Sequence, residues 1–212
     1  MQATEPAAST PTLKRRLTAM VYEFFLLFAV AMLFVGQFAL FTYLRPFLEQ
    51  VTHVSVSMLS ILLLVVGASG FVGTVLIGRV LDKGLFRTLA ILPAIMAGVA
   101  VALALFGGST LAAAALLAVW GFAGTAAPVA WWTWLARTVP DEAEAGGGLM
   151  VAVVQLAITL GATVGGLVFD ATGPVIEVLS SAGLLVVAAL AALSLARFHG
   201  RPAEADRPTG PP

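Results

Sequence analysis

The stretch LSILLLVVGASGFVGTVLIGRVLDKGLFRTLAILPAIMAGVAVALALF, residues 59–106, consists of two apolar runs joined by a short charged segment. That segment, GRVLDKGLFR (residues 78–87), holds four charged side chains, whereas the runs on either side of it hold none. A helix needs about 20 predominantly apolar residues to cross a hydrocarbon core of roughly 30 Å. The stretch therefore predicts two transmembrane helices with a tight turn between them.

The same composition extends along the whole chain. Of its 212 residues 60% are hydrophobic and 10% are charged, and the mean hydropathy is +1.02. Soluble globular domains carry about 25% charged residues, so this composition predicts a membrane protein. Counting apolar stretches of sufficient length predicts an all-α protein with six transmembrane helices, at residues 22–43, 56–78, 89–106, 111–132, 148–169 and 175–196.

The distribution of Lys and Arg predicts an orientation in the membrane. With six spans, ten of the 11 basic residues fall on one side and Arg45 alone falls on the other. Basic residues accumulate on the cytoplasmic side, so we expect a multi-pass protein of the cell (inner) membrane with both termini cytoplasmic. Residues 1–19 and 198–212 are rich in Pro, Ala, Thr and charge and are expected to be disordered cytoplasmic tails that flank a six-span unit at 20–197.

Several classes of function are disfavoured. The net charge is zero and KRR at 14–16 is the longest basic run, which gives no indication of a nucleic-acid partner. The absence of cysteine excludes disulfides and thiol chemistry, and we expect neither a cofactor nor a metal. GASG at 67–70 matches the GxSG sequence of rhomboid-type proteases, but a nucleophilic serine needs a base within reach. His53 and His199 both fall outside the spans, so an enzyme is not expected.

Polar side chains mark particular spans. They occur in the first, second, fourth and fifth spans, whereas the third has none and the sixth is interpreted as having serines alone. Lipid-facing positions disfavour polar groups, so the four polar spans should surround a cavity while the third and sixth pack outside, a pattern of two three-helix repeats. The candidate cavity residues are Gln37, Phe41, Tyr43, Arg45, Ser60, Thr125, Gln155, Thr159 and Thr163.

Two features of this cavity have alternative interpretations. Arg45 either faces the cavity or extends to the outer headgroups, and Pro46 is expected to end its helix. Gln155, Thr159 and Thr163 follow one another at intervals of four, which places them on one helix face. We expect this polar stripe to face Gln37 across the cavity, or else to form hydrogen bonds between helices without a ligand.

Small and aromatic residues predict contacts. Gly70, Thr74 and Gly78, like Gly161 and Gly165, have the spacing that lets helices approach closely in lipid. The tryptophans precede Arg137 and are expected to form an aromatic belt at the cytoplasmic interface, with substrate stacking as the alternative; they are Trp131, Trp132 and Trp134.

At this level of detail the chain resembles the C-terminal six-helix half of a major facilitator superfamily transporter of the drug:proton antiporter and sugar-efflux branch. Residues 36–87 are similar to its seventh and eighth helices, and residues 120–174 to its tenth and eleventh. In that family the first, second, fourth and fifth helices of each half contribute to the cavity. The resemblance implies a secondary transporter that moves a small molecule, such as a drug- or sugar-like solute, outward.

The resemblance also assigns a role to the charged turn. The family's loop pattern is G-x-x-x-D-[RK]-x-G-[RK]-[RK]; Gly78, Asp82, Lys83 and Arg87 fit it, whereas Leu85 stands where the second glycine is expected. Together with Arg79 these residues are the candidate cytoplasmic gating loop. The alternative is that the charges only anchor the hairpin in its orientation.

The family has twelve spans, so six spans correspond to one half of its fold. The resemblance implies a partner, either a second copy of the chain or a separate six-helix N-terminal half, in a lipid bilayer. The proline-glycine antiporter motif is missing, and Glu23, Glu49 and Asp170 lie at span ends, so a proton-coupling acid is expected to come from elsewhere. The alternative function is a truncated or split transporter fragment, or a membrane scaffold, without transport activity of its own.

Overall fold

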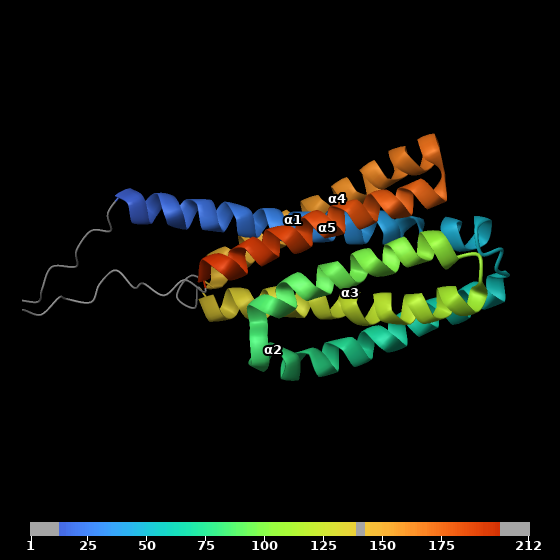
Figure 1. Ribbon diagram of the computed structural model, residues 1–212, viewed down its shortest axis with the longest axis horizontal. Helices are drawn as coiled ribbons and strands as arrows, with labels where there is room; N and C mark the ends of the chain where they lie inside the picture. The colour runs from blue at the N-terminus through green and yellow to red at the C-terminus, as the bar shows by residue number, and fades with distance from the viewer. Residues whose placement is uncertain (1–12, 139–142, 200–212) are drawn as a thin grey trace, which may run out of the picture.

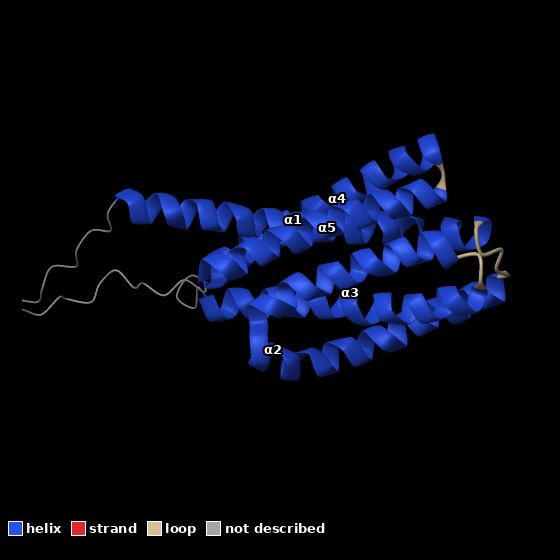
Figure 2. Ribbon diagram, in the orientation of Figure 1, coloured by secondary structure: helices blue, strands red, loops and turns tan. Residues whose placement is uncertain are grey.

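The computed structural model describes residues 13–138 and 143–199, and these residues form five helical elements with no strand among them (Figure 2). The helices are α1 (Leu13–Gln50), α2 (Val56–Phe106), α3 (Thr110–Thr138), α4 (Ala143–Thr172) and α5 (Pro174–His199). By length and composition they contain six segments able to span a membrane. The predicted all-α fold with six spans is therefore confirmed.

The charged turn lies inside α2, which is a hairpin of two arms. Gly84 has non-helical backbone angles (φ 175°, ψ 70°) and separates a first arm, Val56–Asp82, from a second arm, Gly84–Phe106. The Thr52 hydroxyl donates a hydrogen bond of 2.7 Å to the Gly107 carbonyl, so the chain on either side of α2 meets at one end of the bundle. Figure 1 shows the reversal at the green part of α2. The predicted tight turn is confirmed, and within it only Gly84 has non-helical backbone angles.

The two ends of the bundle differ. The connections at 51–55, at 107–109 and at 173 lie together at the end called here the short-loop end (Figure 1, right). The first residue of α1, the kink of α2, the last residue of α3, the first residue of α4 and the last residue of α5 lie toward the opposite, tail end. Each span therefore crosses the full length of the bundle.

Helix ends differ from the sequence prediction in three places. α1 begins at Leu13 and α5 ends at His199, so the expected disordered tails do not extend over residues 13–19 or 198–199; residues 1–12 and 200–212 lie outside the described residues. The prediction that Pro46 ends the first helix is wrong, because α1 continues through it to Gln50. Phe47 and Leu48, just beyond the proline, are fully buried, and this packing offsets a proline cost of about 3 kcal/mol.

The packing of the helices links the two halves of the chain. α1, the first span, packs on α4 and α5, the fifth and sixth; α3, the fourth span, packs on α2, the second and third. The first helix of each three-helix repeat thus packs on the second and third helices of the other repeat. α5 also packs against α2, whose second arm lies nearer to it than the first arm does in Figure 1.

Glycines allow the closest of these contacts. A Cβ atom added at Gly73 on the first arm of α2 would overlap the carbonyl oxygen of Phe122 on α3, and one added at Gly161 on α4 would overlap the main chain of Val35 on α1. The predicted packing role of Gly161 is confirmed. Gly78 has open space around it, so the stripe predicted through that residue is wrong at its last position.

Burial is uneven among the six spans. The first arm of α2 and α4 are the least buried, and they expose large apolar side chains such as Phe71 (73% exposed) and Leu167 (67% exposed). The third and sixth spans, expected on the outside, are more buried than these two within this chain. The second and fifth spans therefore present faces that no other part of the described chain covers.

Two of the three tryptophans expected in an aromatic belt are buried within the chain. Trp131 and Trp134 are buried in the core with their rings edge to face, 6.4 Å between centroids, and Trp132 is partly exposed. Neither buried indole Nε1 has a hydrogen-bond partner among the described residues. Both rings pack in the core instead of facing outward as belt residues do, and their depth in the membrane stays a prediction.

Candidate functional site

A polar stripe runs along the exposed face of α4. Gln155, Thr159 and Thr163 are all exposed. The Thr159 hydroxyl donates to the Gln155 carbonyl at 3.0 Å, and the Thr163 hydroxyl donates to the Thr159 carbonyl at 2.8 Å. Each hydroxyl proton is therefore already bonded, while the hydroxyl oxygens and the Gln155 amide remain free to accept or donate outward.

Gln37 on α1 is tied to α3 instead of facing open space. Its Nε2 donates to the Gly124 carbonyl at 3.0 Å, and its Oε1 is buried without a donor among the described residues. A buried acceptor without a partner costs about 1–3 kcal/mol. Gln37 is half-buried and the α4 stripe is exposed, so the arrangement of the two across a cavity stays a prediction.

Tyr43 joins α1 to α4. Its hydroxyl donates to the Ala162 carbonyl at 3.1 Å, and its ring stacks on Phe169 with 5.2 Å between centroids. Gly166 lies directly against the same hydroxyl, where a Cβ atom would overlap it. Tyr43 is therefore held within a helix contact, one turn from the end of the α4 stripe at Thr163. Phe41, two residues earlier on α1, is exposed.

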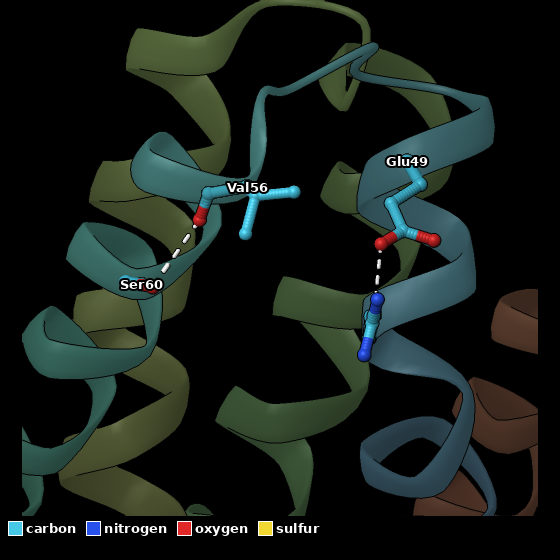
Figure 3. A network of polar contacts seen from close by, with 4 residues as sticks. Glu49, Val56 and Ser60 are labelled. Atoms are coloured by element: carbon cyan, nitrogen blue, oxygen red, sulfur yellow. Dashed lines mark hydrogen bonds and ion pairs between the residues drawn. The ribbon is translucent and has the colours of Figure 1, made fainter.

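Of the remaining candidates, Arg45 and Ser60 make bonds within their own helices, whereas Thr125 makes a bond between helices. Arg45 forms an ion pair of 2.8 Å with Glu49 one turn along α1, and both side chains are exposed. Figure 3 shows Glu49 at this pair and Ser60 donating to the Val56 carbonyl within α2. Thr125 on α3 donates to the Gly70 carbonyl at 2.7 Å, which links α3 to the first arm of α2. The structure thus brings together Thr125 and α2, and it places Arg45 at the short-loop end.

The candidate gating loop contains one contact between distant parts of the chain. Arg137, at the end of α3, donates from a guanidinium nitrogen to Asp82 at 2.9 Å. Gly78, Arg79 and Arg87 are exposed, and the side chain of Lys83 lies outside the described residues. The ion pair joins the kink of α2 to the end of α3 at the tail end of the bundle. If it acts as a gate, the pair has to break when the transporter opens to this side.

The Asp82–Arg137 pair should contribute little to stability. Both side chains are at least half exposed, and exposed pairs contribute about 0.2–1 kcal/mol. We expect Asp82→Asn, Arg137→Gln and the double variant to show a coupling within that range in a double-mutant cycle of thermal unfolding. Raising the salt concentration should reduce it further. A coupling well above this range would indicate a fixed structural contact and argue against a gate.

One functional candidate was missed by the sequence analysis. Glu177 lies in the first turn of α5, inside the sixth span, and is 1% exposed. Ser181, itself fully buried, donates to Glu177 Oε1 at 3.0 Å, and Oε2 has no partner among the described residues. The interpretation that this span has only serines is wrong, whereas the position of Glu177 in the first turn of α5 agrees with the expectation that carboxylates lie near span ends. The signal was an acidic residue four positions before a serine within an apolar run.

Within the described residues, no three carboxylate or histidine side chains are grouped so that they could hold a metal. The candidate functional groups are therefore amides, hydroxyls, one buried carboxyl and two ion pairs.

Comparison with known proteins identifies a family model and several relatives that the chain resembles. The family model described as Major Facilitator Superfamily matches residues 2–162. The chain is 52% identical over 169 residues to the "Transcription regulatory protein OpdE" of Pseudomonas aeruginosa, covering 80% of this chain and 42% of that protein. It is 39% identical over 170 residues to the "Purine ribonucleoside efflux pump NepI" of Salmonella typhimurium, covering 80% of this chain and 43% of that protein. The chain thus spans about two fifths of the length of these relatives.

Proposed function

The chain belongs to the major facilitator superfamily, and from this premise we propose that it is one half of a secondary transporter that exports a small polar solute from the cell by antiport. A drug- or sugar-like solute fits the resemblance of the sequence. The efflux pump NepI, named for purine ribonucleosides, makes these compounds the first substrate class to test.

The polar stripe on α4 carries this proposal. Gln155, Thr159 and Thr163 are exposed on one of the two least buried spans. Polar side chains inside a membrane span are costly against lipid and usually face a water-filled path or a partner. Their amide and hydroxyl groups both donate and accept hydrogen bonds, which matches the hydroxyl and ring-nitrogen groups of a nucleoside.

The proposed transporter needs a second six-helix unit. Secondary transporters of this kind bind substrate between two repeats that rock about a shared site, and the first arm of α2 and α4 expose faces that nothing in the described chain covers. A second copy of the chain, or a separate six-helix half, would cover them. Orientation follows the basic residues: the tail end faces the cytoplasm of an inner-membrane protein, so the Asp82–Arg137 pair forms the cytoplasmic gate.

A membrane scaffold without transport activity, or a fragment that is inactive alone, is the competing function. The name of OpdE, a transcription regulatory protein, is the observation in its favour. A scaffold does not need a water-filled path along α4, so access of water to the polar stripe separates the two functions.

The absence of native cysteine allows this access to be measured directly. We expect Gln155→Cys and Thr159→Cys to react with a water-soluble maleimide in nanodiscs in at least one conformational state, with purine ribonucleoside slowing the reaction. Leu190→Cys is the matched control: Leu190 is exposed, like the stripe, but lies on α5 among apolar residues, and we expect its cysteine to stay unreactive in lipid.

Resistance of both stripe cysteines to the reagent in every state would contradict the cavity. Reaction without any slowing by ribonucleosides would keep the cavity and reject this substrate class.

A further inference from the structure

Glu177 is a carboxyl group placed where the proposed transport cavity does not need it. The face of α5 that carries Ser181 packs against α1 at Gly36, since a Cβ added to Gly36 would lie 3.1 Å from the Ser181 carbonyl oxygen and 3.0 Å from Leu185. Glu177 lies one turn before Ser181 and is bonded to it. The carboxyl group is therefore part of the helix core and is separate from the exposed stripe on α4.

No positive charge compensates this carboxyl group. Among the described side chains no Lys, Arg or His lies within ion-pair distance of Glu177. α1, α2 and α4 all pack against α5. The groups of α1 and α4 near the short-loop end are engaged or exposed: Tyr43 donates to Ala162, Arg45 is paired with Glu49, and Asp170 is exposed. Residues 99–106 of α2 carry no titratable group.

The surroundings of Glu177 give a buried carboxylate little compensation. Oε1 accepts one hydrogen bond, from the Ser181 hydroxyl, whereas Oε2 receives no donor among the described groups. A buried carboxylate needs its remaining lone pairs satisfied or a counter-ion beside it. The main-chain N–H of Glu177 is already bonded to Gly173, so it cannot serve as that donor.

We propose that Glu177 is a proton-binding site in the core of the bundle, neutral while α5 packs against α1 and ionised when the two helices separate enough to admit water. Release transfers the proton from Oε2 to water, which leaves a hydrated carboxylate. The position in the first turn of α5 assists release, because the positive end of the helix dipole favours an anion there. The site is therefore able to exchange its proton instead of holding it permanently.

Infrared spectroscopy tests the site without knowledge of the transported solute. Protein in nanodiscs should show a carboxylic acid carbonyl band at neutral pH that disappears reversibly at alkaline pH. Glu177→Gln, a neutral variant of similar shape, should lack the band, whereas Asp170→Asn, which removes an exposed carboxyl on α4, should keep it. Circular dichroism of each variant establishes that the helices are retained.

A second measurement assigns the site in the unmodified chain, so the test does not depend on the folding of a variant. Dicyclohexylcarbodiimide reacts with protonated carboxyls in apolar surroundings, and peptide mapping should find its adduct on Glu177, with less adduct as the pH rises. A spectrum without a Glu177-dependent acid band at neutral pH, or a band that never responds to pH, would overturn the proposal. Failure of ribonucleoside transport would leave it intact, since neither readout involves transport.

Discussion

Gly73→Ala is expected to destabilise the purified protein by about 1–3 kcal/mol, the usual cost of forcing an extra methyl group into a packed core. The added Cβ would overlap the carbonyl oxygen of Phe122, which belongs to the main chain of α3 and cannot rotate away as a side chain could. The first arm of α2 and α3 would have to move apart over several turns. Thermal unfolding in detergent, followed by tryptophan fluorescence, measures the loss.

The same arm of α2 offers the control. Gly67 has no atom within 4 Å of the position of an added Cβ, and alanine is favoured over glycine in a helix by roughly 0.5–1 kcal/mol. Gly67→Ala should leave stability unchanged or raise it. On α4, Gly161→Ala and Gly148→Ala form a second pair with the same contrast. Equal stability of Gly73→Ala and Gly67→Ala would mean that the close approach of α2 and α3 is absent.

The largest effect on activity is expected from assembly: a single copy of the chain should transport nothing, and transport should appear only in a twelve-helix assembly. One six-helix unit cannot present a site alternately to two sides by rocking against itself. The uncovered faces of the second and fifth spans are the surfaces that a second unit would bury. Counterflow of a labelled purine ribonucleoside in proteoliposomes, together with the mass of the particle in nanodiscs, tests both statements.

Mixing copies distinguishes the two possible partners. A copy with Thr159→Trp, which fills the proposed cavity, should be inactive. Reconstituted in equal amounts with unaltered chain, it should reduce activity to about a quarter if two random copies form the transporter, because only pairs of unaltered copies remain active. If each copy instead pairs with a separately made six-helix half, the mixture should retain about half. Transport by protein that stays monomeric in nanodiscs would refute the requirement for assembly.

The spans were predictable from the sequence because their length is set by a single physical quantity, the thickness of the hydrocarbon core. Apolar runs and charged turns carry that information locally, and the turn around Gly84 was predicted on this basis. Which face of a span packs on protein was less predictable, since lipid and protein core both favour apolar side chains. Hence Trp131 and Trp134 were assigned to the membrane surface although they are buried.

In the candidate site, too, features set by local sequence were predictable and features set by helix packing were not. The spacing of Gln155 and Thr159 on α4 is visible in the sequence, and the structure shows both side chains exposed. The bond from Gln37 to Gly124, 87 positions away, depends on how α1 meets α3 and has no local signal. Glu177 did leave a signal in the sequence, but its burial depends on the packing of α5 against α1, which no property of that span alone determines.

The exchange of partners between the two three-helix repeats has a consequence for biosynthesis. α1 leaves the ribosome before α4 and α5, the helices that it packs on, have been made. The early helices must therefore wait in the bilayer with their contact faces open while the remainder of the chain is inserted. Contacts between residues far apart in the sequence slow folding, so a nascent chain that stops before α4 leaves α1 without its permanent neighbours and is a natural target for quality-control proteases.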